Sequence, residues 1–320
     1  MTTVESVRGP MDVGSLGATL VHEHVFILDH EIEHNYPELW DEDARIADAV
    51  ARLGALKTAG VDTILDPTVL GLGRDIQRVI DVNERVDLNI IPATGIYTFD
   101  SVPFFFSFHG PGTPLGGDEP MVGMFLKDLT EGIGGTSVKA GFLKCAIDST
   151  LTDGVERVFA AVAEASRETG APITVHTSAP HGTGLLAQEY FTKAGVDPGK
   201  LVIGHCGDSA DLDYLHRIID GGSYLGMDRF GLDNLLPTEQ RVATVVQLVS
   251  EGYADRMLLA HDAACHNDWF QPGFPEQVVP DWHFTFISNE VLPKLRQAGL
   301  SEEQITTMLV DNPRRYLSRN

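Results

Sequence analysis

Residues 18–26 read ATLVHEHVF, a short apolar run that carries two histidines two positions apart. Seven more runs of this kind follow, and stretches whose apolar residues recur at helical spacing separate them. These runs are VDTILDPT (61–68), LNIIPATGIY (88–97), AGFLKCAID (140–148), PITVHTS (172–178), LVIGHCGD (201–208), SYLGMDRF (223–230) and RMLLAHDA (256–263). Strands that alternate with helices along the whole chain predict βαβ units and therefore a parallel sheet.

The stretches between the runs have the features of amphipathic helices. DARIADAVARLGALKTAG (43–60) and GVERVFAAVAEASRETG (154–170) both end in glycine, the usual signal of a helix C-terminus. About eight βα units in 320 residues predict an α/β fold, a (β/α)8 TIM barrel that forms a single domain over residues 1–320. A doubly wound open sheet would need a glycine-rich phosphate loop after the first strand, and residues 18–30 contain no glycine.

Composition excludes several classes of function. The formal charge of −23 argues against nucleic acid and against anionic membrane surfaces as partners. No run approaches the roughly 20 apolar residues of a membrane helix, and the first residues lack the pattern of a signal peptide. Three scattered cysteines cannot form a disulfide framework and suggest a reducing compartment. We therefore expect a cytoplasmic protein.

Polar residues that can bind metal ions lie at the ends of the predicted strands. Alternate residues of a strand share one face, so His22 and His24 should point the same way. His176, His205 and Asp262 each close an apolar run that should be buried on both faces. The carboxyl ends of barrel strands meet at one mouth, and imidazole and carboxylate groups are metal ligands. The pattern predicts a metal site at that mouth.

Lys144 lies within another run, and a buried ammonium group near metal ions is unfavourable. One interpretation is that Lys144 pairs with a carboxylate such as Asp148 or Asp262. The other is that carbon dioxide carbamylates the amine, which gives an anion whose two oxygens can bridge two cations. Cys145 and Cys206 directly follow Lys144 and His205, so they should face the opposite way, as buried apolar filler.

The constellation resembles the phosphotriesterase family of the amidohydrolase superfamily, and in particular its phosphotriesterase-like lactonase branch. The resemblance covers nearly the whole chain and rests on TLVHEH (19–24), TGIY (94–97), KAGFLK (139–144), ITVHTS (173–178), DPGKLVIGHCGD (197–208), YLGMDRFGLD (224–233), LLAHD (258–262) and DNPRRYL (311–317). It implies two divalent metal ions (Zn, Fe, Co or Mn), bridged by a carboxylated Lys144 and a hydroxide. The implied ligands are His22, His24 and Asp262 for the buried ion, and His176 and His205 for the exposed one.

The resemblance also implies catalytic roles. The hydroxide attacks the substrate, Asp262 receives its proton as ligand and general base, and Asp208 passes the proton toward solvent. An alternative for Asp208 is a helix N-cap before SADLDYLHR (209–217). Tyr97 would donate a hydrogen bond to the attacked oxygen. Arg229 would hold a carbonyl or the leaving alcohol, or else pair structurally with Asp228 or Asp233.

Two long aromatic segments follow the third and eighth predicted strands, at 98–120 and 263–282. They predict an apolar substrate wall or a subunit interface, with simple packing of the loops onto the barrel as the alternative. Trp269, in the second segment, is the residue there that best matches the lactonases, and we expect it to bind substrate. We expect His261 to lie in the core, and His109, His181 and His266 to have ordinary surface roles.

The predicted function is a lactonase that opens acyl-homoserine lactones or related lactones, as quorum-quenching enzymes do, with weak phosphotriesterase activity. The alternatives are an organophosphate phosphotriesterase and a catalytically silent barrel that serves as a binding module. Stoichiometric metal would argue against the silent barrel. The expected partner is a small-molecule lactone, and the family implies a homodimer.

Overall fold

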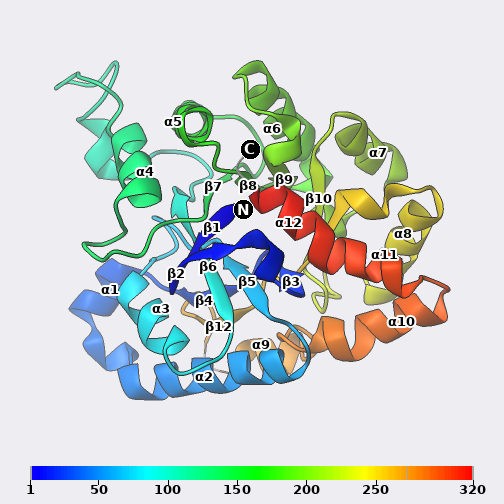
Figure 1. Cartoon of the computed structure of the whole chain (residues 1–320). Helices are drawn as coiled ribbons and strands as arrows, with labels where there is room; N and C mark the ends of the chain where they lie inside the picture. The colour runs from blue at the N-terminus through cyan, green and yellow to red at the C-terminus, as the bar shows by residue number, and fades with distance from the viewer. Residues whose placement is uncertain (1, 272, 319–320) are drawn as a thin grey trace.

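The computed structural model describes residues 2–271 and 273–318, and it contains a parallel barrel surrounded by helices (Figure 1). Eight strands are hydrogen-bonded in the order β11-β10-β9-β8-β7-β6-β5-β3. The barrel closes between its edge strands, where the Val21 amide donates to the Leu259 carbonyl at 3.3 Å. The predicted (β/α)8 barrel is therefore confirmed.

Each predicted strand run contains one strand of the barrel. These strands are β3 (Thr19–Leu20), β5 (Thr63–Asp66), β6 (Asn89–Gly95), β7 (Phe142–Ala146), β8 (Ile173–His176), β9 (Leu201–Ile203), β10 (Tyr224–Met227) and β11 (Met257–Leu259). The first run differs from the prediction because it divides into β3 and β4 (His24–Ile27), and His22 lies between them. β4 leaves the barrel sheet to pair in parallel with β12 (Ala264–Asn267). The sequence did not predict the antiparallel hairpin of β1 (Thr3–Ser6) and β2 (Gly9–Asp12).

Helices follow the strands and form the outer layer. They are α1 (His30–Asn35), α2 (Glu42–Thr58), α3 (Ile76–Asn83), α4 (Pro120–Thr130), α5 (Asp153–Thr169), α6 (Thr183–Lys193), α7 (Leu212–Asp220), α8 (Thr238–Ser250), α9 (Phe274–Val278), α10 (Leu292–Gln297), α11 (Glu302–Thr306) and α12 (Asn312–Leu317). Side-chain caps fix several starts: Asp41 accepts from the Ala44 amide and begins α2. Gly170 ends α5 with φ 69°, a conformation that favours glycine.

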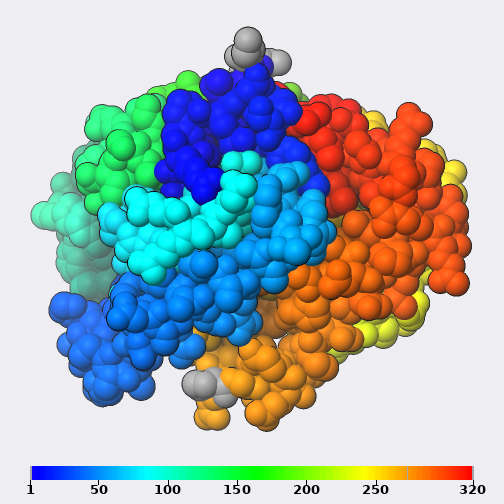
Figure 2. Space-filling model, turned by 60° about the horizontal axis from the view of Figure 1, so that its bottom comes forward, coloured from blue at the N-terminus to red at the C-terminus, as the bar shows by residue number. Residues whose placement is uncertain are grey.

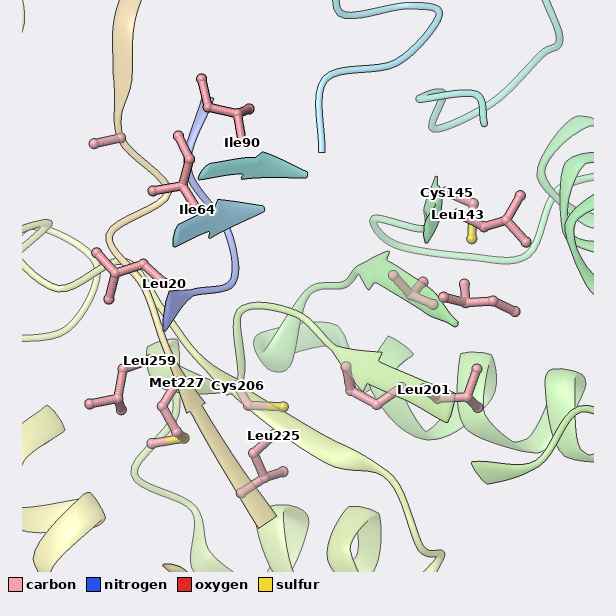
Figure 3. Close-up of a cluster of buried hydrophobic side chains, with 14 of the residues drawn as sticks. Leu20, Ile64, Ile90, Leu143, Cys145, Leu201, Cys206, Leu225, Met227 and Leu259 are labelled. Carbon is pink, nitrogen blue, oxygen red and sulfur yellow. The ribbon is translucent and has the colours of Figure 1, made fainter. Parts of the chain in front are cut away.

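Two layers of apolar side chains stabilise the barrel. Side chains that point outward from the strands, including Leu143 and Cys145, pack beneath the helices, together with Cys206 from the turn after β9 (Figure 3). Side chains that point inward, such as Phe142, fill the barrel near the amino ends of the strands. Tyr316 of α12 packs into this inner layer, with its hydroxyl 2.9 Å from Thr174 Oγ1. The amino end is therefore filled, and polar groups collect at the carboxyl end.

Cys145 and Cys206 are buried in the outer apolar layer, as predicted, and neither forms a disulfide. None of the helices in the described part of the chain combines the length and the apolar character that crossing a membrane requires.

Candidate metal centre

The predicted ligands meet at the carboxyl end of the barrel. Nitrogen atoms of His22 and His205 and a carboxylate oxygen of Asp262 all lie within 4.8 Å of one another. His22 Nε2 is 3.2 Å from Asp262 Oδ1 and 3.3 Å from Lys144 Nζ. Lys144 lies within β7, and His22, His205 and Asp262 follow β3, β9 and β11, so the closed barrel is what brings these groups together.

Each of the two remaining predicted ligands contacts one member of this cluster. His24 Nε2 is 3.4 Å from Asp262 Oδ1, and His176 Nδ1 is 2.7 Å from His205 Nε2. All six residues that the sequence singled out thus form one connected group.

The charges of these groups fit a divalent metal ion. Burial, with a further contribution from Lys144, lowers the pKa of His22 to about 3, and burial also lowers the pKa of His176 well below its usual value. Both rings are therefore neutral and can offer a nitrogen lone pair. Burial raises the pKa of Asp262, but the histidines and Arg229 outweigh this effect and hold it well below its usual range. Neutral imidazoles around a carboxylate are a donor set typical of Zn²⁺ and related ions.

Lys144 lies at the base of the cluster and is 1% exposed. Burial lowers the pKa of its ammonium group to about 8, so a substantial fraction of the amine is neutral near neutral to mildly alkaline pH. Pairing with Asp148 or Asp262 was one interpretation of this residue. Within the described residues Lys144 forms no ion pair with either, and its nearest polar contact is His22. The neutral amine is the form that reacts with carbon dioxide.

Asp228, which the sequence analysis considered only as a partner for Arg229, holds two of the histidines. It is 1% exposed; its Oδ1 accepts from His205 Nδ1 at 2.9 Å, and its Oδ2 accepts from the His205 amide at 3.0 Å. His22 Nδ1 is 3.4 Å from Oδ2. A carboxylate behind a metal-binding imidazole fixes its tautomer and orientation. The signal in the sequence was the aspartate directly after the β10 run.

Arg229 joins two acidic residues of the site. Its Nε donates to Asp262 Oδ2 at 2.9 Å, and Nη1 donates to Asp208 Oδ2 at 2.9 Å. The suggested pairing of Arg229 with Asp228 or Asp233 is therefore wrong. Asp262 and Asp208 raise the pKa of the guanidinium further above its usual value, despite the opposing effect of burial.

Asp208 is not a helix N-cap, so that alternative is also wrong. α7 begins later, and Asp211 accepts from the amides of its first turn. Asp208 Oδ1 instead accepts from Nη2 of the buried Arg241 at 2.7 Å. The carboxylate lies between two guanidinium groups.

Three residues of the site have left-handed backbone conformations that residues other than glycine rarely adopt. They are His205 (φ 62°), Arg229 (φ 63°) and Asp262 (φ 57°), the only such non-glycine residues in the described chain. Each follows the end of a neighbouring barrel strand. Such conformations cost free energy and are concentrated at functional sites, where they direct a side chain.

A cavity of about 390 Å³ opens above the cluster. Tyr97 lines it, with its hydroxyl 3.5 Å from His176 Nδ1 and its ring centroid 6.3 Å from that of Trp269. Burial raises the pKa of Tyr97 well above its usual value, so its hydroxyl remains protonated. Most of the wall is apolar. Phe270, Phe274 and Trp282 come from the aromatic segment at 263–282, as predicted, whereas nothing in the sequence indicated the apolar lining residues Ile27, Leu72, Leu232, Leu235, Val278 and Val279.

The two aromatic segments differ in their relation to the cavity. The segment at 263–282 supplies much of the wall and contains β12 and α9, so it is more ordered than the predicted loop. None of the described residues of 98–120 lines the cavity, although the Phe99 ring lies 5.1 Å from that of His176. Phe104 remains 78% exposed, and Phe105 is 51% exposed. The prediction of a substrate wall is therefore wrong for that segment.

His261 is buried, as predicted, because its Nδ1 pairs with Glu23 Oε1 at 2.8 Å and its Nε2 accepts from the Ile287 amide. Glu23 also accepts from the Ala263 amide, which ties the first strand to the segment after the eighth. The three histidines for which surface roles were predicted lie outside the cluster: His181 is beside Ser178, His109 is stacked on Phe105, and His266 packs against Trp40.

A barrel that gathers histidines and an aspartate at its carboxyl end has the arrangement of a metal-dependent enzyme. Comparison with known proteins gives the family. Residues 2–317 match the model of the phosphotriesterase family. A "phosphotriesterase homology protein" of Mycobacterium tuberculosis is 52% identical, over 100% of this chain and 98% of its own length. The chain belongs to the phosphotriesterase family.

Two further comparisons agree with this assignment. An "aryldialkylphosphatase" of Saccharolobus solfataricus is 39% identical, over 95% of each chain. A solved structure described as the phosphotriesterase from Mycobacterium tuberculosis superposes with a TM-score of 0.97, over 99% of this chain and 98% of its own.

Proposed function

We propose that this chain is a two-metal lactonase that opens acyl-homoserine lactones or related lactones, with weaker activity on phosphotriesters. The observation that carries the proposal is the combination of Tyr97 above the ligand cluster with a mostly apolar cavity. A lactone with an acyl chain has a small polar head and an apolar tail. Its head would reach the ligand cluster while its tail lies along Trp269 and Phe270.

The proposed ligands are those the resemblance implies. His22, His24 and Asp262 would hold one ion, His176 and His205 the other, and a carbamate on Lys144 would bridge both. When bound, such ions lower the pKa of water and polarise the carbonyl of the substrate.

The other side chains of the site would have separate roles in catalysis. Tyr97 keeps its proton and would donate a hydrogen bond to the carbonyl oxygen as negative charge develops there. Asp262 would accept the proton released from the attacking water. The apolar wall would exclude bulk water from the acyl chain.

The route of that proton follows from Arg229. The guanidinium lies between Asp262 and Asp208 and keeps its own proton, so it does not relay another. We therefore propose that Asp262 returns the proton to the alkoxide of the opened ring. Asp208 would act by positioning Arg229, which revises its expected role as a proton carrier.

A second candidate is a phosphotriesterase as the main activity, and the names of two relatives, "phosphotriesterase homology protein" and "aryldialkylphosphatase", favour it. The experiment that separates the two is Tyr97→Phe, assayed on an acyl-homoserine lactone and on an aryl phosphotriester. Loss of one such donor costs about 100- to 1,000-fold in turnover. The lactonase proposal expects that loss on the lactone and a much smaller one on the triester, whose tetrahedral centre and bulkier arms fit the tyrosine poorly. Equal losses on both substrates would contradict it.

Three wider expectations remain part of the proposal. The lactone would be a quorum signal, the protein would act in the cytoplasm, and it would form a homodimer. Exposed phenylalanines at 104, 105 and 108 provide an apolar surface of the kind that subunit interfaces bury. A sedimentation measurement of the mass in solution tests the dimer.

A further inference from the structure

A second cavity, of about 310 Å³, lies behind the wall of the first. One side is a face of α2, which presents Arg45, Asp48 and Arg52. The other side is built by β12 and the segment that follows it, with Glu276 among its polar residues. Figure 2 shows where these parts of the chain meet, as the boundary between the blue surface of α2 and the orange surface around residues 264–283. The cavity lies outside the ligand cluster and contains none of the proposed ligands.

Arg45 is the one arginine of this cavity that contacts no carboxylate among the described residues. Arg52 is matched twice, because its Nε donates to Asp48 at 2.8 Å and its Nη2 donates to Glu276 at 3.2 Å. Arg45 has no side-chain hydrogen bond or ion pair with any described residue, and its buried Nε has no partner. His266 adds no charge, because burial and the nearby Arg45 lower its pKa to about 4. An unpaired guanidinium with a buried donor nitrogen is costly unless something accepts from it.

We propose that this cavity binds a small organic monocarboxylate, and that Arg45 recognises its carboxylate group. A planar guanidinium matches a carboxylate through two parallel hydrogen bonds. The two arginines and the two carboxylates of the lining cancel in formal charge, so a ligand with one negative charge meets less repulsion from Asp48 and Glu276 than a phosphate dianion would. Phe270, Pro280 and Trp282 give the cavity apolar surface for the organic part of the ligand.

The two cavities share a wall, which gives the site a consequence for catalysis. Asn267, Phe270, Pro275, Val279 and Trp282 line both. A ligand held on Arg45 restricts the positions of these side chains, so it changes how well the catalytic cavity accepts an acyl group. The effect should appear in KM more than in kcat. Coupling between two sites commonly changes affinity about fivefold or more.

Calorimetric titration of the metal-loaded protein with sodium hexanoate tests the site without depending on any activity. Four proteins are compared: wild type, Arg45→Gln, Arg45→Lys, and Arg85→Gln, which removes the same charge at an exposed position outside the cavity. We expect wild type and Arg85→Gln to bind alike and Arg45→Gln to bind about tenfold more weakly or worse. Arg45→Lys should bind at an intermediate level. The neutral analogue hexanamide should bind poorly to all four.

Three results would overturn the proposal. They are no hexanoate binding to wild type, equal binding to wild type and Arg45→Gln, or equal binding of hexanoate and hexanamide. Hexanoate held at the metal ligands alone would give the second result, because that binding does not need Arg45. Steady-state kinetics with any ester that the enzyme hydrolyses then tests the coupling: hexanoate should shift KM in wild type and less in Arg45→Gln. The same shift in both proteins would contradict coupling through the shared wall.

Discussion

Asp228→Asn should weaken metal binding although Asp228 is not among the proposed ligands. The aspartate meets His205 at both its amide and its Nδ1, and it also meets His22 Nδ1. Hydrogen bonds to a charged acceptor contribute roughly 1 kcal/mol more than those to a neutral one, so three contacts lose about 3 kcal/mol. Part of that loss destabilises the metal-free protein as well, so it does not appear in the metal affinity. We expect metal affinity to drop by about 10- to 100-fold, as is usual for residues that support metal ligands.

The assay is competition for Zn²⁺ or Co²⁺ between the metal-free protein and a chromophoric chelator. Asp220→Asn is the matched control, since it removes the same charge at an exposed position at the end of α7. At saturating metal the variant should regain most of its activity, because the ligands themselves remain. An affinity equal to that of wild type would refute the idea that Asp228 orients the two imidazoles.

Three further predictions concern the proposed bridging lysine and the arginine at the mouth. Lys144→Ala should lose metal and activity, and a short carboxylic acid added with metal should restore part of both; full metal content without the acid would exclude a bridging role. In metal-free, carbon-dioxide-free protein, Lys144 has a pKa of about 8 when folded against about 10.4 when unfolded, so the unfolded chain binds more protons in that range. Stability to urea should therefore rise with pH from about 8 to 10.5, by about 3 kcal/mol relative to Lys144→Met, and parallel pH profiles for the two proteins would count against it. Arg229→His should shift the ratio of catalytic efficiencies toward phosphotriesters, while an unchanged ratio would mean that Arg229 only braces Asp262 and Asp208.

The barrel was predictable because its strands are short and buried on both faces. Runs such as AGFLKCAID therefore contrast clearly with the amphipathic helices between them. The candidate metal ligands could be recognised for the same reason, because a histidine or lysine is unusual in an otherwise apolar run. Lys144 and Cys145 could even be assigned to opposite faces by alternation alone.

Contacts between distant segments were not predictable in this way. Asp228 supports His205 and His22 only because the closed barrel places β10 beside β9, and no spacing in the sequence encodes that pairing. The same holds for Arg229, whose partners Asp208 and Asp262 come from the ends of two other strands. Its assumed neighbours, Asp228 and Asp233, were chosen by proximity in sequence. The first run divides at His22, and β4 then pairs with β12 and not with a strand of the barrel. This pairing was also not predictable from the sequence.

We propose that the site prefers a lactone to a phosphotriester, and the catalytic efficiencies of the metal-loaded wild-type protein measure this preference. An acyl-homoserine lactone and an aryl dialkyl phosphotriester are compared in the same buffer, each with its uncatalysed rate subtracted. We predict a higher kcat/KM for the lactone, because Tyr97 and the apolar cavity fit a flat carbonyl with a chain. A higher kcat/KM for the phosphotriester would contradict the lactonase assignment and leave the metal-dependent hydrolase intact.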